Sequence, residues 1–335
     1  MTGESRAAPP ECFAVDRTPP TAPAGDPDGN VLERAKELDF EQRSRLRSLR
    51  RVTLTLSMSR RMWRRFWGRT LAAGARPVPH PPAGTIALTW VGHATVMLTT
   101  PRLRVVTDPM LEDTLWGLPR ARAAALDPAD LDDVGLILIS HAHRDHLSLA
   151  TLRRMPRTAT VVVPTRCAPL VAPLGFKNVV ELGVGQDMDQ ADVRVTAVPA
   201  RHSGARGLLD RRRRGVNGYM LRTGGRNIYY AGDTGYFAGF VELQRRFAPD
   251  VALLPISGYQ PAPFRDEHLS PLDAAFAFED LRARILIPIA HGSFLLSYEP
   301  LDEPLAWLEE LARARQGALA AGLTVLGHGQ TCLLR

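Results

Sequence analysis

The chain has 335 residues, 45% of them apolar, and 42 Lys and Arg against 35 Asp and Glu give it a net charge of +7. This length suits one large domain or two small ones with an ample core. No apolar stretch approaches the roughly 18 residues that span a bilayer, and no signal peptide is visible. Three widely spaced cysteines without a Cys-x-x-Cys pattern argue against a disulfide framework. A cytoplasmic location is therefore expected.

Residues 1–85 are predicted to form an extension that precedes the main domain. The first 30 residues are rich in Pro, Ala and Gly, as in a disordered tail, and residues 74–85 form a Pro-rich connector. Residues 53–71 predict an amphipathic helix with arginines on one arc and these apolar side chains on the other: Leu56, Met62, Trp63, Phe66 and Trp67. Such a helix either makes peripheral contact with an anionic membrane or packs its aromatic face onto the domain.

From Ile86 onward, short β-rich runs alternate with helical segments. The early runs, such as IALTWVG and TVMLTT, follow one another as hairpins, whereas later runs such as VALLPIS and RILIPIAH alternate with helices. Helices are predicted near residues 149–155, 238–248, 270–283 and 304–318. This order predicts that residues 86–335 form one α/β domain, a four-layer αββα sandwich with two sheets inside and helices outside. The helical N-terminal extension precedes it.

Several predicted strands end in polar side chains. The densest group is HAHRDH, residues 141–146, which follows the apolar run GLILIS. Single groups follow four other runs: Asp108, His202, Asp233 and His291. Strand ends present side chains to a cleft, so we expect these groups to converge. Four ionisable groups as close as those in HAHRDH would repel one another or lose solvation unless a cation lay among them.

Imidazole and carboxylate groups are the usual ligands of zinc and similar divalent ions. Seven side chains are candidate ligands, enough for two zinc ions that share Asp233: His141, His143, Asp145, His146, His202, Asp233 and His291. Two ions about 3.5–4 Å apart can hold a hydroxide as nucleophile, which predicts a metal-dependent hydrolase with Asp145 and Asp233 in its catalytic centre. A P-loop, a Gly-x-Ser-x-Gly elbow and a Rossmann glycine pattern are not found, so nucleotide-binding and serine-hydrolase functions have no support.

The order of these motifs resembles the metallo-β-lactamase-fold hydrolases. TWVGHATVML, TDPML, SHAHRDHLS, YYAGDTGYF and HLSPLDA are most similar to the branch that contains N-acyl-phosphatidylethanolamine phospholipase D and the ascorbate-6-phosphate lactonases. The resemblance covers residues 86–335. It implies one zinc ion on His141, His143 and His202, and a second on Asp145, His146 and His291, with Asp233 bridging the two.

The resemblance also implies supporting roles for three further residues. Asp108 and His93 would lie close to the ligands and support them, since an acidic group commonly orients a ligand imidazole. His268, in HLSP, matches a histidine of the phospholipase pocket and would donate a proton to the leaving group. Relatives commonly read His-Trp-Gly-Thr-Phe where this chain has Ala-His-Gly-Ser-Phe, so His291 lies one place later than the pattern. This departure concerns the second metal rather than the fold.

The motifs specify the fold more closely than they specify the substrate. A phosphodiester such as a phospholipid of the N-acyl-phosphatidylethanolamine type is favoured, with lactone or ester hydrolysis as the alternative. A nuclease and a non-catalytic metal-binding sensor are further alternatives. No base-stacking surface is recognisable, so no nucleic-acid partner is expected, and the complete ligand set argues against a decayed site. The run DRRRRG, residues 210–215, is either a solvated loop or a place that captures an anionic head group, with Arg206 and Arg211 as candidates.

Overall fold

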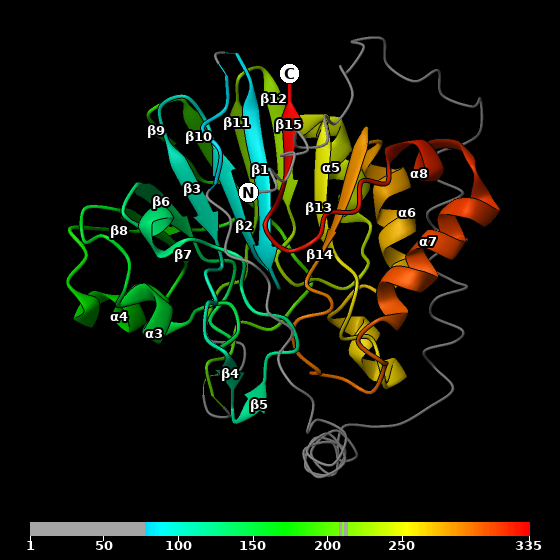
Figure 1. Ribbon diagram of the computed structural model, residues 1–335, viewed down its shortest axis with the longest axis horizontal. Coiled ribbons are helices and arrows are strands. Elements are labelled where there is room, and N and C mark those ends of the chain that lie inside the picture. Colours follow the sequence, from blue (N-terminus) through cyan, green and yellow to red (C-terminus); the bar gives the residue numbers. More distant parts are fainter. Residues whose placement is uncertain (1–77, 83, 208–209, 211–213) are drawn as a thin grey trace, which may run out of the picture.

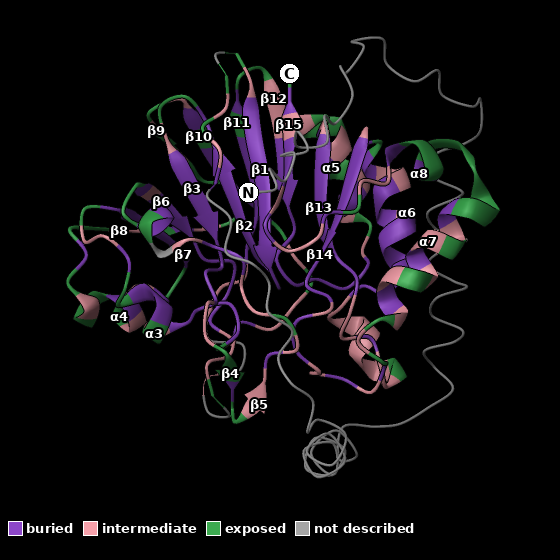
Figure 2. Cartoon of the chain, viewed as in Figure 1, coloured by how far each residue is buried: buried purple, intermediate pink, exposed green. Residues whose placement is uncertain are grey.

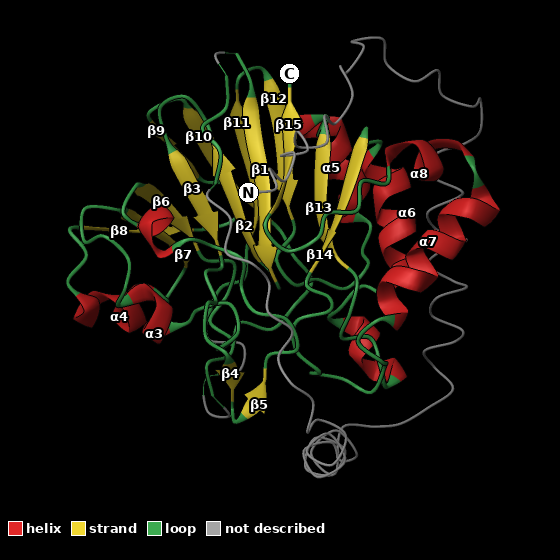
Figure 3. Cartoon of the chain, viewed as in Figure 1, coloured by secondary structure: helices red, strands yellow, loops and turns green. Residues whose placement is uncertain are grey.

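The computed structural model describes residues 78–82, 84–207, 210 and 214–335. Two β-sheets face each other at its centre (Figure 1), and helices cover their outer faces (Figure 3). One sheet has the strand order β15-β1-β2-β3-β6-β7-β8 and the other the order β14-β13-β12-β11-β10-β9. The four-layer αββα sandwich predicted from the sequence is therefore confirmed. The amphipathic helix predicted at residues 53–71 lies outside the described residues.

The seven-stranded sheet and the small β4–β5 hairpin are formed mainly by the first part of the described chain. Their strands are Ile86–Gly92 (β1), Thr95–Thr99 (β2), Arg104–Thr107 (β3), Thr114–Leu115 (β4), Leu118–Pro119 (β5), Val134–Leu138 (β6), Thr160–Pro164 (β7), Asn178–Leu182 (β8) and Gln330–Leu334 (β15). The six-stranded sheet contains Asp187–Gln190 (β9), Val193–Val198 (β10), Gly218–Thr223 (β11), Arg226–Tyr230 (β12), Val251–Pro255 (β13) and Ile285–Ile289 (β14).

Four helices lie close to their predicted positions: Leu149–Leu152 (α3), Gly239–Phe247 (α5), Pro271–Leu281 (α6) and Glu303–Arg315 (α7). Two short helices, Ala168–Val171 (α4) and Gly317–Gly322 (α8), were not predicted, and 3₁₀ turns lie at Pro128–Leu131, Ala172–Leu174 and Ala262–Asp266. α6 begins where Ser270 and Asp273 form a capping box and Pro271 occupies the first turn. Among the described residues, no helix is long and apolar enough to cross a membrane.

The space between the two sheets is the main core. Ile86, Leu88 and Trp90 of β1 point into it and meet side chains of the other sheet, among them Tyr230 and Leu253. All seven residues of β1 are buried (Figure 2). A second core lies under α5 to α8, and a third under α3 and α4.

Two further features bear on the expectations from sequence. The backbone N–H of buried Val78, in the predicted connector, donates to the Asp130 carboxylate at 2.9 Å, so the end of that connector packs on the domain. Cys167 is a free, buried thiol.

Candidate metal centre

The loop after β6 and the loop after β10 bring three imidazoles together. His141 Nε2 lies 2.8 Å from His143 Nδ1, which in turn lies 3.1 Å from His202 Nε2. In two of these rings the other nitrogen, Nδ1, also has a polar partner. His202 Nδ1 donates to the Glu267 carbonyl at 2.8 Å, and His141 Nδ1 lies 2.9 Å from Ser140 Oγ. Three ring nitrogens therefore face one point, as the ligands of a single zinc ion do.

These imidazoles are held in the neutral form that binds metals. Burial, together with the neighbouring histidines, lowers the pKa of His141 well below its ordinary value. Burial and the adjacent His268 do the same to the pKa of His202. A neutral imidazole keeps a lone pair on one nitrogen, so no proton has to leave these two rings when a cation binds.

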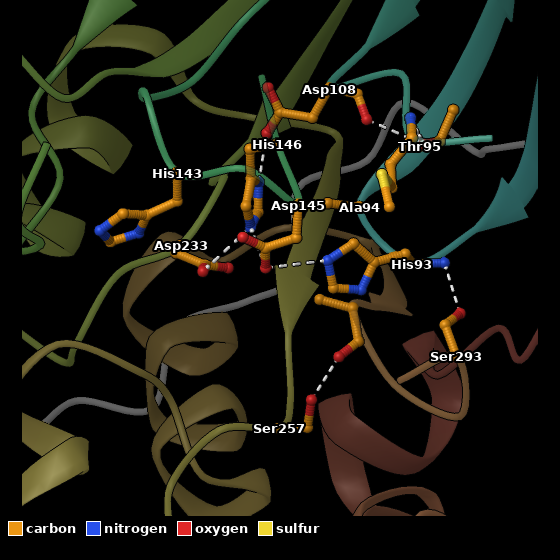
Figure 4. A network of polar contacts seen from close by, with 12 residues as sticks. His93, Ala94, Thr95, Asp108, His143, Asp145, His146, Asp233, Ser257 and Ser293 are labelled. Carbon is orange, nitrogen blue, oxygen red and sulfur yellow. Dashed lines mark hydrogen bonds and ion pairs between the residues drawn. The ribbon is translucent and has the colours of Figure 1, made fainter. Parts of the chain in front are cut away.

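A second group of possible ligands contains His93, Asp145 and His146 (Figure 4). His146 Nε2 lies 3.5 Å from Asp145 Oδ2 and 3.1 Å from Asp233 Oδ2, yet it makes no hydrogen bond to any described residue. Burial opposes a charge on His146, but Asp233 and Asp145 raise its pKa well above the ordinary value. A fully buried nitrogen that faces two carboxylates without a hydrogen bond fits a metal ligand.

Asp233 lies between the two groups. Its Oδ2 is 3.1 Å from His146 Nε2, 4.0 Å from His141 Nε2 and 3.7 Å from His268 Nε2. Burial alone would raise the pKa of Asp233, but the surrounding imidazoles, His146 above all, hold it well below the ordinary value. An ionised carboxylate in this central position is placed as a ligand shared by two cations would be.

Asp108 supports ligands of both groups through hydrogen bonds. Its Oδ2 accepts hydrogen bonds from His146 Nδ1 at 2.7 Å, Tyr230 Oη at 2.6 Å and Ser140 Oγ at 2.5 Å. The backbone N–H of Ser140 donates to Oδ1 at 2.7 Å. Neither Ser140 nor Tyr230 stands out in the sequence, although Tyr230 follows the inward alternation of β12.

His268 reaches the centre from the segment before α6. Its Nδ1 donates to the Phe264 carbonyl at 3.1 Å, which leaves Nε2 toward Asp233 and the cavity described below. Its ring lies edge-on to that of His202, with 4.9 Å between centroids. The structure therefore brings His268 to the same centre as the predicted ligands.

The predicted substrate arginines have a different setting. Arg206 donates from Nη1 to the carbonyls of Ala142 at 3.0 Å and Leu147 at 2.5 Å, so its guanidinium braces the HAHRDH loop. Its interpretation as a substrate-binding residue is not supported by this position. Arg211 lies outside the described residues.

His291 is the predicted ligand that the structure does not bring to the others. It belongs to none of the groups of three possible ligands among the described residues. Its ring lies against Trp90 instead, with 4.6 Å between centroids and 32° between the ring planes. The reason is its place in the loop after β14, where Ala290, with φ of 57°, rather than His291, lines the cavity beside the possible metal ligands.

A small cavity of about 90 Å³ opens beside the two groups. His93, Asp145, Asp233 and His268 form its polar end. The opposite walls are mainly apolar: Phe264, Phe294, Leu295, Leu296, Pro300, Leu301 and Pro304. Among the described residues that line it there is no Arg or Lys. Mainly apolar walls with a few polar groups at one end are typical of a site for a small molecule or part of a lipid.

Comparison with known proteins agrees with this geometry. Residues 103–291 match the family described as the beta-lactamase superfamily domain. The chain belongs to the β-lactamase superfamily. It is 30% identical over 281 residues to N-acyl-phosphatidylethanolamine-hydrolyzing phospholipase D 1 of Caenorhabditis elegans, an alignment that covers 75% of this chain and 76% of that protein. It is 31% identical to a metal-dependent hydrolase of Methanopyrus kandleri, over 67% of this chain and 92% of that protein.

Solved structures share the fold of this superfamily member. A metallo hydrolase of the archaeon Ignicoccus hospitalis superposes with a TM-score of 0.57 at 24% identity, over 75% of this chain and 99% of that chain. An isothiocyanate hydrolase from Delia radicum gut bacteria superposes with a TM-score of 0.60 at 19% identity, over 73% of this chain and 97% of that chain. The sequence matches and the shared fold together show a metal-dependent hydrolase of the metallo-β-lactamase superfamily.

Proposed function

We propose that the protein is a two-zinc hydrolase that cleaves a phosphodiester, with a phospholipid of the N-acyl-phosphatidylethanolamine type as the favoured substrate. The observation that carries this proposal is the convergence of two groups of possible ligands on Asp233. One ion would bind His141, His143 and His202, and the other would bind Asp145 and His146, with Asp233 between them. Bound zinc would supply Lewis acidity and lower the pKa of water.

The protein's own groups supply charge, orientation and a proton. Asp145 and Asp233 both stay ionised, because the neighbouring imidazoles outweigh burial and lower the pKa of each carboxyl below its ordinary value. They provide the negative charge that holds two cations. His268, fixed by the Phe264 carbonyl, would protonate the departing oxygen from the cavity side. The apolar walls of the cavity would contact the uncharged part of the substrate.

Phospholipid hydrolysis is supported by the relationship to the phospholipase D of Caenorhabditis elegans and by the apolar cavity walls. Lactone or carboxylic ester hydrolysis is a second candidate, favoured by the lack of any Arg or Lys among the described residues that line the cavity. Without such a cation, the negative charge of a phosphodiester would be neutralised by the metals alone.

A substrate panel separates these candidates. Metal-analysed protein is assayed on an N-acyl-phosphatidylethanolamine in mixed micelles, on a small phosphodiester, on a lactone and on a carboxylic ester. The proposal expects release of a phosphatidic acid from the lipid, complete loss of activity after chelation and recovery on addition of zinc. Cleavage of the lactone with no cleavage of either phosphodiester would replace it with the second candidate.

Peripheral membrane contact on the cytoplasmic side, through residues 53–71, goes with this proposal. Its support is the arc of arginines and aromatic residues in the sequence. Flotation of the full chain with vesicles that contain an anionic phospholipid tests it. Charge reversal at Arg60, Arg64 and Arg65 should reduce flotation and leave hydrolysis of a small soluble substrate unchanged.

A further inference from the structure

His93 lies in the tight turn between β1 and β2 and has a left-handed backbone, with φ of 52°. Non-glycine residues seldom adopt this conformation unless the surrounding structure holds them in it. Three hydrogen bonds do so here. The His93 carbonyl accepts from Trp90 Nε1 at 2.8 Å and from the Ala290 N–H at 2.9 Å, and its own N–H donates to Ser293 Oγ at 2.8 Å.

The neighbouring glycine shows how closely this turn is packed. Gly92 has φ of 130°, and a Cβ at that position would lie 2.9 Å from the His328 ring. Trp90 contacts both His328 and His291 through their rings, with centroid separations of 4.7 and 4.6 Å. The turn therefore rests on a layer of three aromatic rings, one of which is His291.

This backbone aims the His93 side chain at the second group of possible ligands. Its Nε2 lies 3.3 Å from Asp145 Oδ2, and Nε2, a carboxylate oxygen of Asp145 and a ring nitrogen of His146 all lie within 4.8 Å of one another. All three side chains are buried. The Phe294 ring stands edge-on to that of His93, with 5.6 Å between centroids, and limits its movement. The strained backbone, the burial and the orientation of His93 thus all favour a role for its imidazole in the second group.

His291 is also buried, and its Nε2 makes no hydrogen bond to a described residue, but its ring lies in a different place. It lies under the turn as part of the aromatic layer and joins no group of possible ligands among the described residues. A zinc site built from protein needs about three or four ligands, and Asp145, His146 and the shared Asp233 leave one position to fill. His93 is the histidine beside that position.

We infer that His93, and not His291, is the remaining protein ligand of the second metal, and that His291 is a positioning residue that supports the turn carrying His93. This inference rests on the proposed two-metal function and deepens it. In the bound state the His93 Nε2 lone pair would face the ion and its proton would reside on Nδ1. The hydrogen bond between His93 and Asp145 would give way to coordination by both groups.

Metal stoichiometry of purified variants tests the inference without reliance on activity. His93→Asn removes the imidazole, and Asn tolerates the left-handed backbone; His93→Gly is a second variant that tolerates it equally well. His291→Phe keeps a ring against Trp90 but has no nitrogen. Each apo-protein is first checked for a folded far-UV spectrum, then loaded with zinc, desalted and analysed by mass spectrometry, and zinc affinity is measured against a chromophoric chelator.

The expected result is two equivalents of zinc in the wild-type chain and in His291→Phe, and one equivalent in both His93 variants. Cobalt substitution gives a second readout, since loss of one imidazole ligand should change the visible absorption of the second site only in the His93 variants. Two tightly held equivalents in the His93 variants, or the loss of one in His291→Phe, would overturn the inference, as would a wild-type chain that binds a single equivalent. A wild-type chain that holds two ions and hydrolyses nothing in the substrate panel would instead overturn the proposed function alone.

Discussion

Asp108 accepts the Nδ1 proton of His146 at 2.7 Å and, through the Ser140 hydroxyl, also reaches the ring of His141. One buried carboxylate thus orients an imidazole in each of the two groups of possible ligands. A hydrogen bond on the far nitrogen fixes the tautomer and leaves the near nitrogen free to bind a metal. The same carboxylate accepts the Tyr230 hydroxyl, whose pKa burial and Asp108 raise well above its ordinary value, so that it remains a donor.

Asp108→Asn should therefore weaken zinc binding at both positions. Asn keeps the size of Asp and tolerates its backbone, which has φ of 35°, but at most one of its side-chain atoms can accept. We expect zinc affinity to fall by about 10–100-fold, the usual effect of removing such a support. Tyr230→Phe removes one donor and leaves the carboxylate, so it is the matched control. Equal affinities in the two variants would show that the charge on Asp108 has no role in orientation.

The positions of most predicted ligands follow from the sequence because of a general property of this topology. Asp108, His141 and Asp233 each follow a strand that runs in parallel with a neighbour, so the loops that carry them meet at one edge of the sandwich. The HAHRDH spacing then brings His141, His143 and His146 close together within a single loop. The apolar periodicity of each strand and the polar residue that follows it are therefore enough to predict that these ligands converge.

The positions of His93 and His291 do not follow from the sequence. They depend on contacts between segments about 200 residues apart, such as the 2.8 Å hydrogen bond from the His93 N–H to Ser293 Oγ. They also depend on left-handed backbone at His93 and Ala290, which apolar periodicity does not reveal. A displacement of one residue in the loop after β14 decides whether Ala290 or His291 lines the cavity beside the possible ligands. Sequence order alone cannot show that.

His268→Asn should lower the rate of the chemical step while leaving metal content at the wild-type level. Asn retains polarity but cannot supply a proton to the departing oxygen. For a substrate with an alkoxide leaving group we expect kcat to fall by roughly 100-fold, within the usual range for a lost general acid. A nitrophenolate departs without protonation, so its hydrolysis should fall much less. Equal losses on the two substrates would exclude proton donation, and a loss of zinc would show that His268 is a ligand.

Arg206→Gln should weaken the HAHRDH loop rather than the binding of an anionic substrate. The guanidinium donates to the carbonyls of Ala142 and Leu147, and burial lowers its pKa without leaving it neutral at pH 7. Loss of these charged donors should cost about 2 kcal/mol of unfolding free energy, or roughly 4–8 °C in Tm for a domain of this size. The KM values for an anionic phosphodiester and for a neutral ester should change by the same factor. A KM increase confined to the anionic substrate would return Arg206 to a substrate-binding role.

His328 should make the stability of the metal-free protein depend on acid pH. Burial, and next the nearby arginines Arg120 and Arg122, lower its pKa from 6.5 to about 4, against a favourable hydrogen bond to the Ala123 carbonyl. Below pH 6.5 the unfolded chain takes up a proton on this imidazole that the folded chain does not bind until about pH 4. The free energy of unfolding therefore decreases as the pH falls through that window, by up to about 1.4 kcal/mol per pH unit for one full proton.

His328→Gln removes that titration and also part of the ring contact with Trp90. The variant should be less stable than the wild type at pH 7.5, and the difference should narrow steadily as the pH is lowered toward 4. Urea unfolding at pH 7.5, 6, 5 and 4.5, with a chelator present so that metal release does not contribute, measures both curves. His291, whose pKa burial and then His328 lower to about 3, also titrates in both proteins, so the comparison is made above pH 4. Two curves that stay parallel over this range would show that the imidazole of His328 has the same proton affinity in the folded and unfolded chains.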